Sequence, residues 1–226
     1  MAEVIIALDL PSGTEALRLL DRLPDADWVK VGPILMTREG PALLRQLVTR
    51  RLRVFLDLKW HDIPHTVAGA VEAARELSVA MATVHTLGGA AMMRSASEAA
   101  GEALGLIGVT VLTSHDQAGY GAAVGRDRVD LGAEVQRQAG IAIGAGLRGI
   151  VCSSHEAAAV RRVVGVSPWI VVPGIRRPSD RSGDQMRTAS PADAVRQGAT
   201  HLVVGRPILL AADPGAAFRE ISEAAA

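Results

Sequence analysis

The chain has 226 residues, 49% of them apolar, with a mean hydropathy of +0.23, so it can bury a substantial core. Its 24 basic and 24 acidic residues balance and its isoelectric point is near 7.0, which argues against the basic surface of a nucleic-acid-binding protein. The single cysteine, Cys152, excludes an internal disulfide, and the chain contains no run of about 18 uncharged apolar residues that could span a membrane.

The N-terminal sequence MAEVIIALDL indicates in which cellular compartment the protein is expected. It lacks a basic segment, and Asp9 interrupts its short apolar stretch, so it does not resemble a secretory signal. The lone cysteine fits a reducing environment, and its apolar surroundings in GIVCSS predict a small buried strand residue. We therefore expect a soluble cytoplasmic protein without nucleic-acid or membrane partners.

Short apolar runs rich in β-branched residues alternate along the whole chain with longer segments rich in Ala, Leu and Arg. The short runs are nearly continuously apolar, as parallel strands are when helices cover them. They predict strands at Val4–Leu8, Trp28–Val31, Arg53–Leu58, Met81–His85, Leu106–Leu112, Gly149–Cys152, Trp169–Val172 and His201–Val204. The longer segments predict helices at Thr14–Leu23, Pro41–Arg50, Thr66–Leu77, Gly89–Ala100, Leu131–Ala145, His155–Val164, Pro191–Gln197 and Pro214–Ala225.

One helix start is marked in detail. Ser190 fits an N-cap, Pro191 fits the first helical position, and Asp193 places an acid in the first turn. This combination predicts that a helix begins directly after Ser190.

Eight strand–helix units in 226 residues leave about 28 residues for each unit, which is enough for a (β/α)8 barrel. The main alternative is a doubly wound open sheet, whose first turn should carry phosphate-binding glycines. Here that turn reads ALDLPSGT, with Asp9 where the glycines should begin. Because no linker, charge block or low-complexity tract divides the chain, we predict one α/β domain over residues 1–226, a (β/α)8 TIM barrel.

Charged residues stand at the ends of the first three predicted strands, where such barrels form their active sites. Asp9 ends the first strand, Lys30 the second, and Asp57 and Lys59 the third. Because strand side chains alternate between faces, Asp57 and Lys59 should both enter the barrel mouth, near Lys30. An ordinary buried salt bridge would explain one pair, but with Asp62 the cluster is too costly to bury for stability alone. It therefore predicts a catalytic centre.

A second set of polar residues follows the last two predicted strands. The loop Pro173–Arg187 is rich in Gly, Ser and Asp, and the eighth strand ends in Gly205 and Arg206. Barrels often bind phosphate in the loops after strands seven and eight. Arg206 would offer a forked donor, and Gly205 would let the backbone approach the ligand. A surface loop with a solvated arginine is the alternative, but the position favours a phosphate site.

His61 and His65 lie four residues apart with Asp62 between them, which imitates a metal-ligand spacing. Pro64 disfavours a regular helix through both histidines, and Lys59 would repel a nearby cation. We therefore predict no metal site at this position.

Other residues that could take part in catalysis have ordinary structural explanations. His85 and His201 lie on apolar strands and are expected to be core histidines with satisfied hydrogen bonds. Ser154 fits a helix N-cap better than a nucleophile, because no nucleophile elbow or Ser–His–Asp pattern is present.

The motifs ALDL, VKVG, FLDLKWHDIPHT, VTVLTS, PGIR, GDQ and VGRP, in this order and spacing, resemble those of orotidine 5′-monophosphate decarboxylases. These enzymes make UMP and carbon dioxide in the last step of pyrimidine nucleotide synthesis, without a cofactor. The resemblance covers almost the whole chain. Its Asp-x-Lys-x-x-Asp spacing is shared with sugar-phosphate decarboxylases, but HDIP-x-T followed by PGIR and GDQ narrows the match to the orotidine enzymes.

The resemblance implies a catalytic network of Lys30, Asp57, Lys59 and Asp62. Lys59 would protonate the pyrimidine carbon as carbon dioxide leaves, and Asp57 would lie beside the departing carboxylate. A fixed ammonium suits this reaction because loss of carbon dioxide leaves a carbanion that no cofactor stabilises.

The resemblance also implies the substrate ligands. The ribose hydroxyls would contact Asp9 and Lys30, and Thr113 would face the pyrimidine. The phosphate ligands would be Arg176, Gln185, Gly205 and Arg206.

The resemblance implies a homodimer, in which Asp62 and Thr66 complete the partner's site. One departure is His65, a position where bacterial members commonly carry Asn; it leaves the catalytic positions unchanged. Two alternatives stay open. A metal-dependent keto-sugar-phosphate decarboxylase would need a carboxylate-rich magnesium site, and a non-catalytic barrel would bind UMP without turnover.

Overall fold

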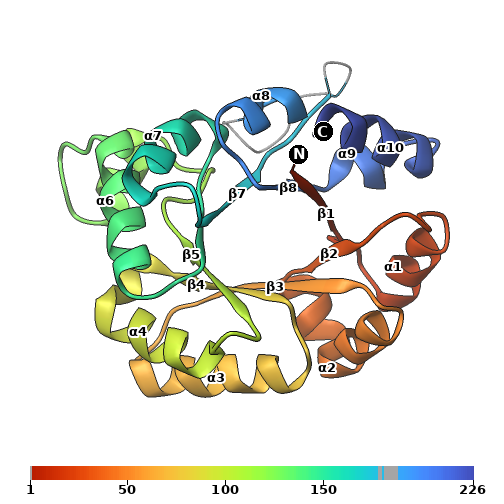
Figure 1. The fold of residues 1–226 in the computed structure, drawn as a ribbon, viewed down its shortest axis with the longest axis horizontal. Helices are drawn as coiled ribbons and strands as arrows, with labels where there is room; N and C mark the ends of the chain where they lie inside the picture. The colour runs from red at the N-terminus through yellow and green to blue at the C-terminus, as the bar shows by residue number, and fades with distance from the viewer. Residues whose placement is uncertain (1, 178–179, 181–187) are drawn as a thin grey trace.

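The computed structural model describes residues 2–177, 180 and 188–226. Its strands are all parallel and pair in sequence order, and β1 (Glu3–Ala7) also pairs with β8 (His201–Val204), which closes the sheet. Figure 1 shows the helices arranged around the ring of strands. The predicted (β/α)8 barrel is confirmed.

All eight predicted strands are present, with small differences at their ends. The other six are β2 (Trp28–Val31), β3 (Arg53–Trp60), β4 (Met81–His85), β5 (Gly105–Val109), β6 (Gly149–Val151) and β7 (Trp169–Pro173). The fifth strand was predicted to reach Leu112 but ends at Val109, which pairs with Val151, the last residue of β6. The third strand runs beyond its predicted end to Trp60.

The predicted helices are present as α1 (Gly13–Leu20), α2 (Pro33–Thr49), α3 (Pro64–Glu76), α4 (Gly89–Ala100), α6 (Leu131–Gly144), α7 (Ser154–Val164), α8 (Pro191–Arg196) and α10 (Pro214–Ala224). Helix α2 already begins at Pro33, and it continues through a kink at Gly40, where φ is 61°, into the predicted start at Pro41. Three short helices were not predicted: η1 (Thr86–Gly88), α5 (Gln117–Ala123) and α9 (Arg206–Leu209).

Two helix starts test the capping expectations. Ser190 accepts a hydrogen bond from the Asp193 N–H at the start of α8, as predicted. The expectation for Ser154 was wrong, because Ser153 caps α7 in a reciprocal pair with Glu156. Ser154 is instead the first residue of that helix.

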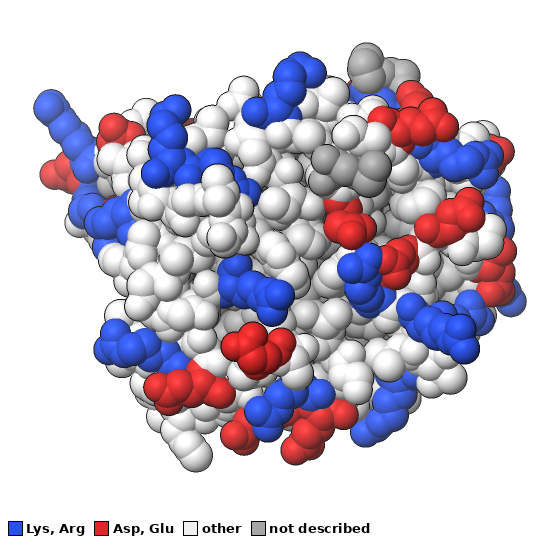
Figure 2. All heavy atoms as spheres, in the orientation of Figure 1, with Lys and Arg blue, Asp and Glu red and all other residues white. Residues whose placement is uncertain are grey.

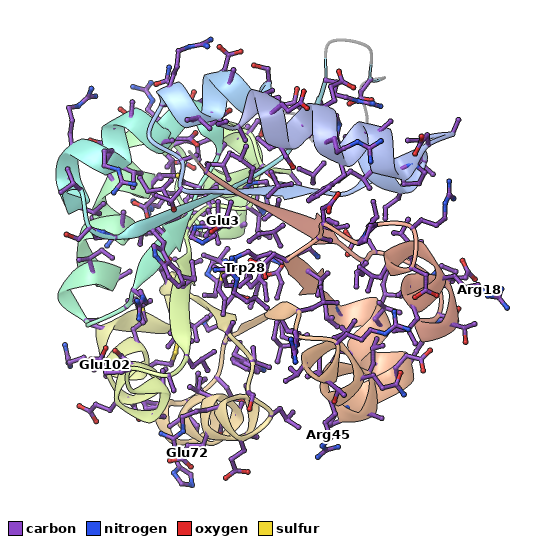
Figure 3. All side chains as sticks on the ribbon, turned by 45° about the vertical axis from the view of Figure 1, so that its right-hand side comes forward. Glu3, Arg18, Trp28, Arg45, Glu72 and Glu102 are labelled. Atoms are coloured by element: carbon purple, nitrogen blue, oxygen red, sulfur yellow. The ribbon has the colours of Figure 1, made fainter. Side chains whose placement is uncertain are left out.

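The barrel interior is filled by side chains at alternate strand positions. They are Ile5, Ala7, Trp28, Phe55, Met81, Ile107, Val171 and Val203. A larger apolar layer lies between the strands and the helices and includes Cys152, which is buried as predicted. Figure 3 shows Trp28 within the ring of strands, whereas Arg18, Arg45 and Glu72 point outward from helices. The barrel is therefore a packed core, and any large cavity must lie at one of its ends.

The outer surface carries mixed charges. On the face seen in Figure 2, the coloured basic and acidic side chains are interspersed rather than gathered into a basic patch. None of the described helices combines the length and apolar character needed to cross a bilayer.

Candidate active site

A cavity of about 510 Å³ opens at the carboxyl ends of the strands. Interior residues of the barrel, Ala7, Phe55, Val171 and Val203 among them, form its apolar part. Its polar wall contains eight of the residues singled out from the sequence: Asp9, Lys30, Asp57, Lys59, Thr113, Arg176, Gly205 and Arg206. The structure thus gathers into one cavity residues that are spread over the whole chain.

Acidic and basic groups alternate along one wall of this cavity. The Lys30 ammonium donates to Asp9 Oδ1 over 2.9 Å and lies 3.7 Å from Asp57 Oδ2. The Lys59 ammonium donates to Asp57 Oδ1, also over 2.9 Å. Each lysine therefore faces a carboxylate, and Asp57 lies between the two lysines.

Burial and charge act in opposite directions on Asp57. Burial acts to raise the pKa of its carboxyl group, but the ammonium groups of Lys59 and Lys30 and hydrogen bonds from Lys59 and Thr83 outweigh it. The pKa of Asp57 is therefore held below its ordinary value, and the group is ionised near neutral pH. The Lys59 side chain keeps 35% of its surface exposed, so its ammonium is anchored by Asp57 yet still accessible from the cavity.

Thr83, on β4, belongs to this site but was not predicted. Its buried hydroxyl donates to Asp57 Oδ1 over 3.0 Å and accepts the Lys59 N–H over 2.9 Å. Its sequence signal was weak, because it is a single hydroxyl residue within an apolar run that precedes His85. Its role in holding Asp57 and the Lys59 backbone is seen only from its contacts with the neighbouring strand β3.

The backbone at Lys59 departs from a regular strand. Its φ is 52°, and the pairing of β3 with β4 shifts register between Leu56 and Trp60. Simple alternation placed Lys59 in the barrel mouth, and the side chain does line the cavity, but it reaches there through this irregularity. A left-handed lysine is uncommon and strained, and such residues concentrate at functional sites.

The adjoining part of the wall, after β7 and β8, carries the candidate phosphate ligands. Arg176 follows β7, and Gly205 and Arg206 follow β8. A Cβ added at Gly205 would lie 3.6 Å from Ala7 Cβ, an ordinary contact, so the protein itself does not require glycine there. A ligand packed against the backbone at this point would require it. Gln185 lies outside the described residues.

Asp62 and Thr66 do not line this cavity. Both are exposed: Asp62 accepts the N–H of Ile63, and Thr66 lies in the first turn of α3. Two large apolar side chains nearby are also exposed, Ile63 by 66% and Leu87 by 43%. Within a single chain, the structure therefore leaves these two residues apart from the others.

The histidines fall into two groups. His201 is buried with its Nδ1 2.8 Å from Thr200 Oγ1, as expected of a core histidine. His85 is only half-buried, because it ends β4 at the rim and stacks on the exposed ring of His61 at 5.6 Å. Burial, followed by the nearby His61 and Lys59, lowers the pKa of His85 to about 4. Among the described residues, no group of three or more His, Cys, Asp or Glu is placed to hold a metal ion.

Comparison with known proteins places this chain in a family. The sequence model of the orotidine 5′-phosphate decarboxylase / HUMPS family matches residues 2–221. The chain is 51% identical to orotidine 5′-phosphate decarboxylase of Alkalilimnicola ehrlichii, covering 97% of this chain and 94% of that protein. It is 46% identical to that of Anaeromyxobacter sp. strain K, with 97% and 96% covered.

A solved structure agrees. The crystal structure of orotidine 5′-phosphate decarboxylase from Lactobacillus acidophilus superposes with a TM-score of 0.88 at 34% identity, covering 100% of this chain and 99% of that one. The chain therefore belongs to the orotidine 5′-phosphate decarboxylase / HUMPS family.

Proposed function

We propose that this protein decarboxylates orotidine 5′-monophosphate to UMP and carbon dioxide, the last step of pyrimidine nucleotide synthesis, without a metal or organic cofactor. One observation carries the proposal: the Lys59 ammonium is held by Asp57 in a cavity whose far wall presents Arg176 and Arg206. An anchored cation at one side and arginines at the other suit a substrate with a reacting carboxylate and a distant phosphate. The names of the relatives at 46–51% identity support the same reaction.

The parts of the substrate follow the order of the cavity wall. The phosphate would contact Arg176, Gln185, Gly205 and Arg206, the ribose Asp9 and Lys30, and the pyrimidine Thr113. Binding energy from the remote phosphate can then hold the ring in place at the reacting end.

The reaction breaks the bond between the ring carbon and the carboxylate, and the electron pair stays on the carbon. The Lys59 ammonium lies where it stabilises this developing charge and then donates one of its protons to the carbon. Asp57 holds Lys59 in place and disfavours the substrate carboxylate beside it. Lys30 offsets the charge of Asp57 from the other side.

We further propose a homodimer in which Asp62 and Thr66 enter the partner's cavity. Both are exposed outside their own cavity, beside the exposed apolar side chains of Ile63 and Leu87. A Cβ added at Gly88 would lie 3.3 Å from the His61 ring, so η1 borders the loop that carries Asp62. Exposed apolar side chains that would be buried at the centre of a contact, with polar groups around them, are typical of a stable interface.

We also propose that residues 1–226 form one domain and that the enzyme is cytoplasmic. The Ala2 N–H donates to Ala225 O over 2.9 Å, so the described ends of the chain are joined (Figure 1). One cooperative unfolding transition, seen alike by fluorescence and circular dichroism, would support a single domain, and two separate transitions would contradict it.

The direct test follows the absorbance of orotidine 5′-monophosphate with and without EDTA. We expect turnover that the chelator leaves unchanged. Activity lost with EDTA and restored by magnesium would favour a metal-dependent keto-sugar-phosphate decarboxylase instead. Tight UMP binding in calorimetry with no turnover would favour a non-catalytic nucleotide-binding barrel.

A further inference from the structure

A network of buried polar side chains lies behind one wall of the cavity without lining it. Its members are Thr86 on η1, Tyr120 on α5, and Glu134 and Gln138 on α6, and none is more than 5% exposed. None of the four is among the cavity-lining residues of the described chain. The proposed reaction does not use them directly.

Gln138 is the centre of the network. Its Nε2 donates to Tyr120 Oη and to Glu134 Oε1, both over 2.8 Å, and its Oε1 accepts from Thr86 Oγ1 over 2.7 Å. A carboxylate only accepts hydrogen bonds, so Glu134 fixes which end of the Gln138 amide faces it. The Tyr120 hydroxyl then donates its proton to Glu134 over 3.2 Å. The Gln138 N–H groups and the Tyr120 hydroxyl each have a defined acceptor, and the single Thr86 hydroxyl proton is shared between Gln138 Oε1 and the carbonyl oxygen of Val109.

The carboxylate at the end of the network is itself anchored. Glu134 pairs with Arg137 over 2.6 Å and with Arg126 over 3.2 Å. The hydrogen bond from Arg137, reinforced by those from Gln138 and Arg126, outweighs burial and lowers the pKa of Glu134 to about 2. Glu134 therefore remains an acceptor throughout the physiological pH range.

The network holds both ends of one cavity-lining segment. Thr86 Oγ1 lies 2.9 Å from the carbonyl oxygen of Val109, the last residue of β5. Tyr120 lies on α5, which follows the segment. Between these two points, Val111, Leu112 and Thr113 line the cavity. Gln138 on α6 is thus hydrogen-bonded to Thr86, which contacts the chain before this wall. Gln138 and Glu134 are both hydrogen-bonded to Tyr120, which follows the wall in the chain.

Stability alone does not explain such a network, because apolar side chains of similar volume often stabilise a core as well as buried polar groups do. A satisfied polar network instead fixes one arrangement of the chain. We propose that Glu134 and Gln138 are positioning residues that place residues 111–113 against the pyrimidine through Thr86 and Tyr120. This inference rests on the proposed function, since it takes that wall to face the base.

The test compares Gln138→Met with the wild-type enzyme. Methionine keeps the length of the side chain but removes its donors and its amide oxygen. We expect KM for orotidine 5′-monophosphate and Kd for UMP to rise about 5- to 30-fold, as for one or two lost buried interactions. The kcat should stay within about 3-fold, because Lys59 and Asp57 do not touch the network.

Two substitutions at Thr86, one isosteric and one that keeps the hydroxyl, distinguish an effect on substrate binding from an effect on folding. Thr86→Val removes the hydroxyl and should raise KM in the same way, whereas Thr86→Ser keeps the hydroxyl and should retain the wild-type KM. Thr200→Val is the matched structural control at the other end of the barrel, where the hydroxyl accepts the Ile170 N–H over 2.9 Å. We expect Thr200→Val to lower Tm but to leave KM unchanged.

The outcomes are distinct. A wild-type enzyme without turnover would remove the proposed function itself. The positioning role would be overturned by a different result in an active wild-type background. In that case Gln138→Met and Thr86→Val would lower Tm, as Thr200→Val does, but would leave KM and the affinity for UMP unchanged. If Gln138→Met does not fold, Tyr120→Phe, which removes one hydroxyl, answers the same question with the same expected direction of change in KM.

Discussion

Both ends of the barrel gather charged side chains, but they hold them differently. At the carboxyl end, Lys30 and Lys59 pair with carboxylates along one wall of a cavity of about 510 Å³, with Asp57 between them. The Lys59 ammonium remains exposed to that cavity. Its charge is therefore positioned but still available to a bound molecule.

At the amino end, cations lie over aromatic rings, and one of them, Arg53, also pairs with Glu3 and Asp27. The guanidinium of Arg53 is 4.8 Å from the centre of the Trp28 ring, and that of Arg148 is 4.7 Å from the Trp169 ring. His201 lies against both indoles, at centroid distances of 5.6 Å and 4.8 Å. Figure 3 shows Glu3 and Trp28 at this part of the barrel. Aromatic faces stabilise these cations, and Trp28, Arg53 and Trp169 line a second hollow at this end.

The comparison shows that a charged residue indicates a functional site only when its position along the strand is also considered. Lys30 and Arg53 lie on neighbouring strands, yet Lys30 lies near the carboxyl end of β2 and lines the cavity, whereas Arg53 begins β3 at the amino end. We therefore expect changes at the carboxyl end to affect the rate and changes at the amino end to affect stability.

The largest expected effect is at Lys59. Lys59→Ala removes the proton donor and should lower kcat by at least about 10²-fold, the lower end for a lost general acid, with little change in Tm. The matched control is Arg148→Ala, which removes a cation at the opposite end. It should keep the wild-type kcat/KM. Equal losses of kcat in the two variants would contradict the proposed difference between the two ends of the barrel.

The next effect concerns the shared site. A mixture of Lys59→Ala and Asp62→Ala chains, each inactive alone, should form heterodimers with one intact site and one site that lacks both groups. Random exchange would restore up to about a quarter of the wild-type activity, since half of the dimers are mixed and each has one of two sites intact. Activity that stays at the level of the separate variants after proven exchange would argue against the shared site.

A smaller effect is expected at Thr83. Thr83→Val removes the donor to Asp57 and leaves the Lys59 N–H without its acceptor, which should lower kcat about 10-fold. Thr83→Ser keeps the hydroxyl and should recover most of the rate. A valine variant with wild-type kcat would show that Asp57 alone holds Lys59.

The last effect belongs to the amino end and changes the pH dependence of stability, with no expected effect on the rate. Burial, with the nearby Arg53, lowers the pKa of His201 to about 4, so the unfolded chain takes up a proton first as the pH falls. The free energy of unfolding should therefore decrease between about pH 6.5 and pH 4, by up to roughly 3 kcal/mol for this residue. His201→Leu should flatten but not abolish the slope, because His85 titrates in the same direction. An unchanged slope in urea titrations would contradict the assignment to His201.

Much of the fold could be predicted from the sequence because its signals are local. Each parallel strand is a short apolar run, and Asp9, Lys30 and Asp57 interrupt these runs at their ends. Their meeting in one cavity follows from the closed barrel, which brings all the carboxyl ends of the strands together.

The remaining features depend on contacts between distant parts of the chain. Thr83 reaches Asp57 across 26 positions, and Thr86 reaches Gln138 across 52. The left-handed φ of Lys59 arises from a register shift between two strands, which no single segment encodes. Such partners are set by packing, so neither periodicity nor motif spacing reveals them.

The most direct test of the central claim restores the ammonium chemically. Lys59→Cys should lack activity, and alkylation with 2-bromoethylamine would give a thioether side chain that again ends in an ammonium. The native Cys152 is only 1% exposed, so the reagent should modify position 59, and treated wild-type enzyme should keep its activity. We expect the treated variant to gain at least about 10-fold in kcat over the untreated one. A variant that mass spectrometry shows to be fully alkylated at residue 59, but whose rate does not change, would contradict the role of Lys59.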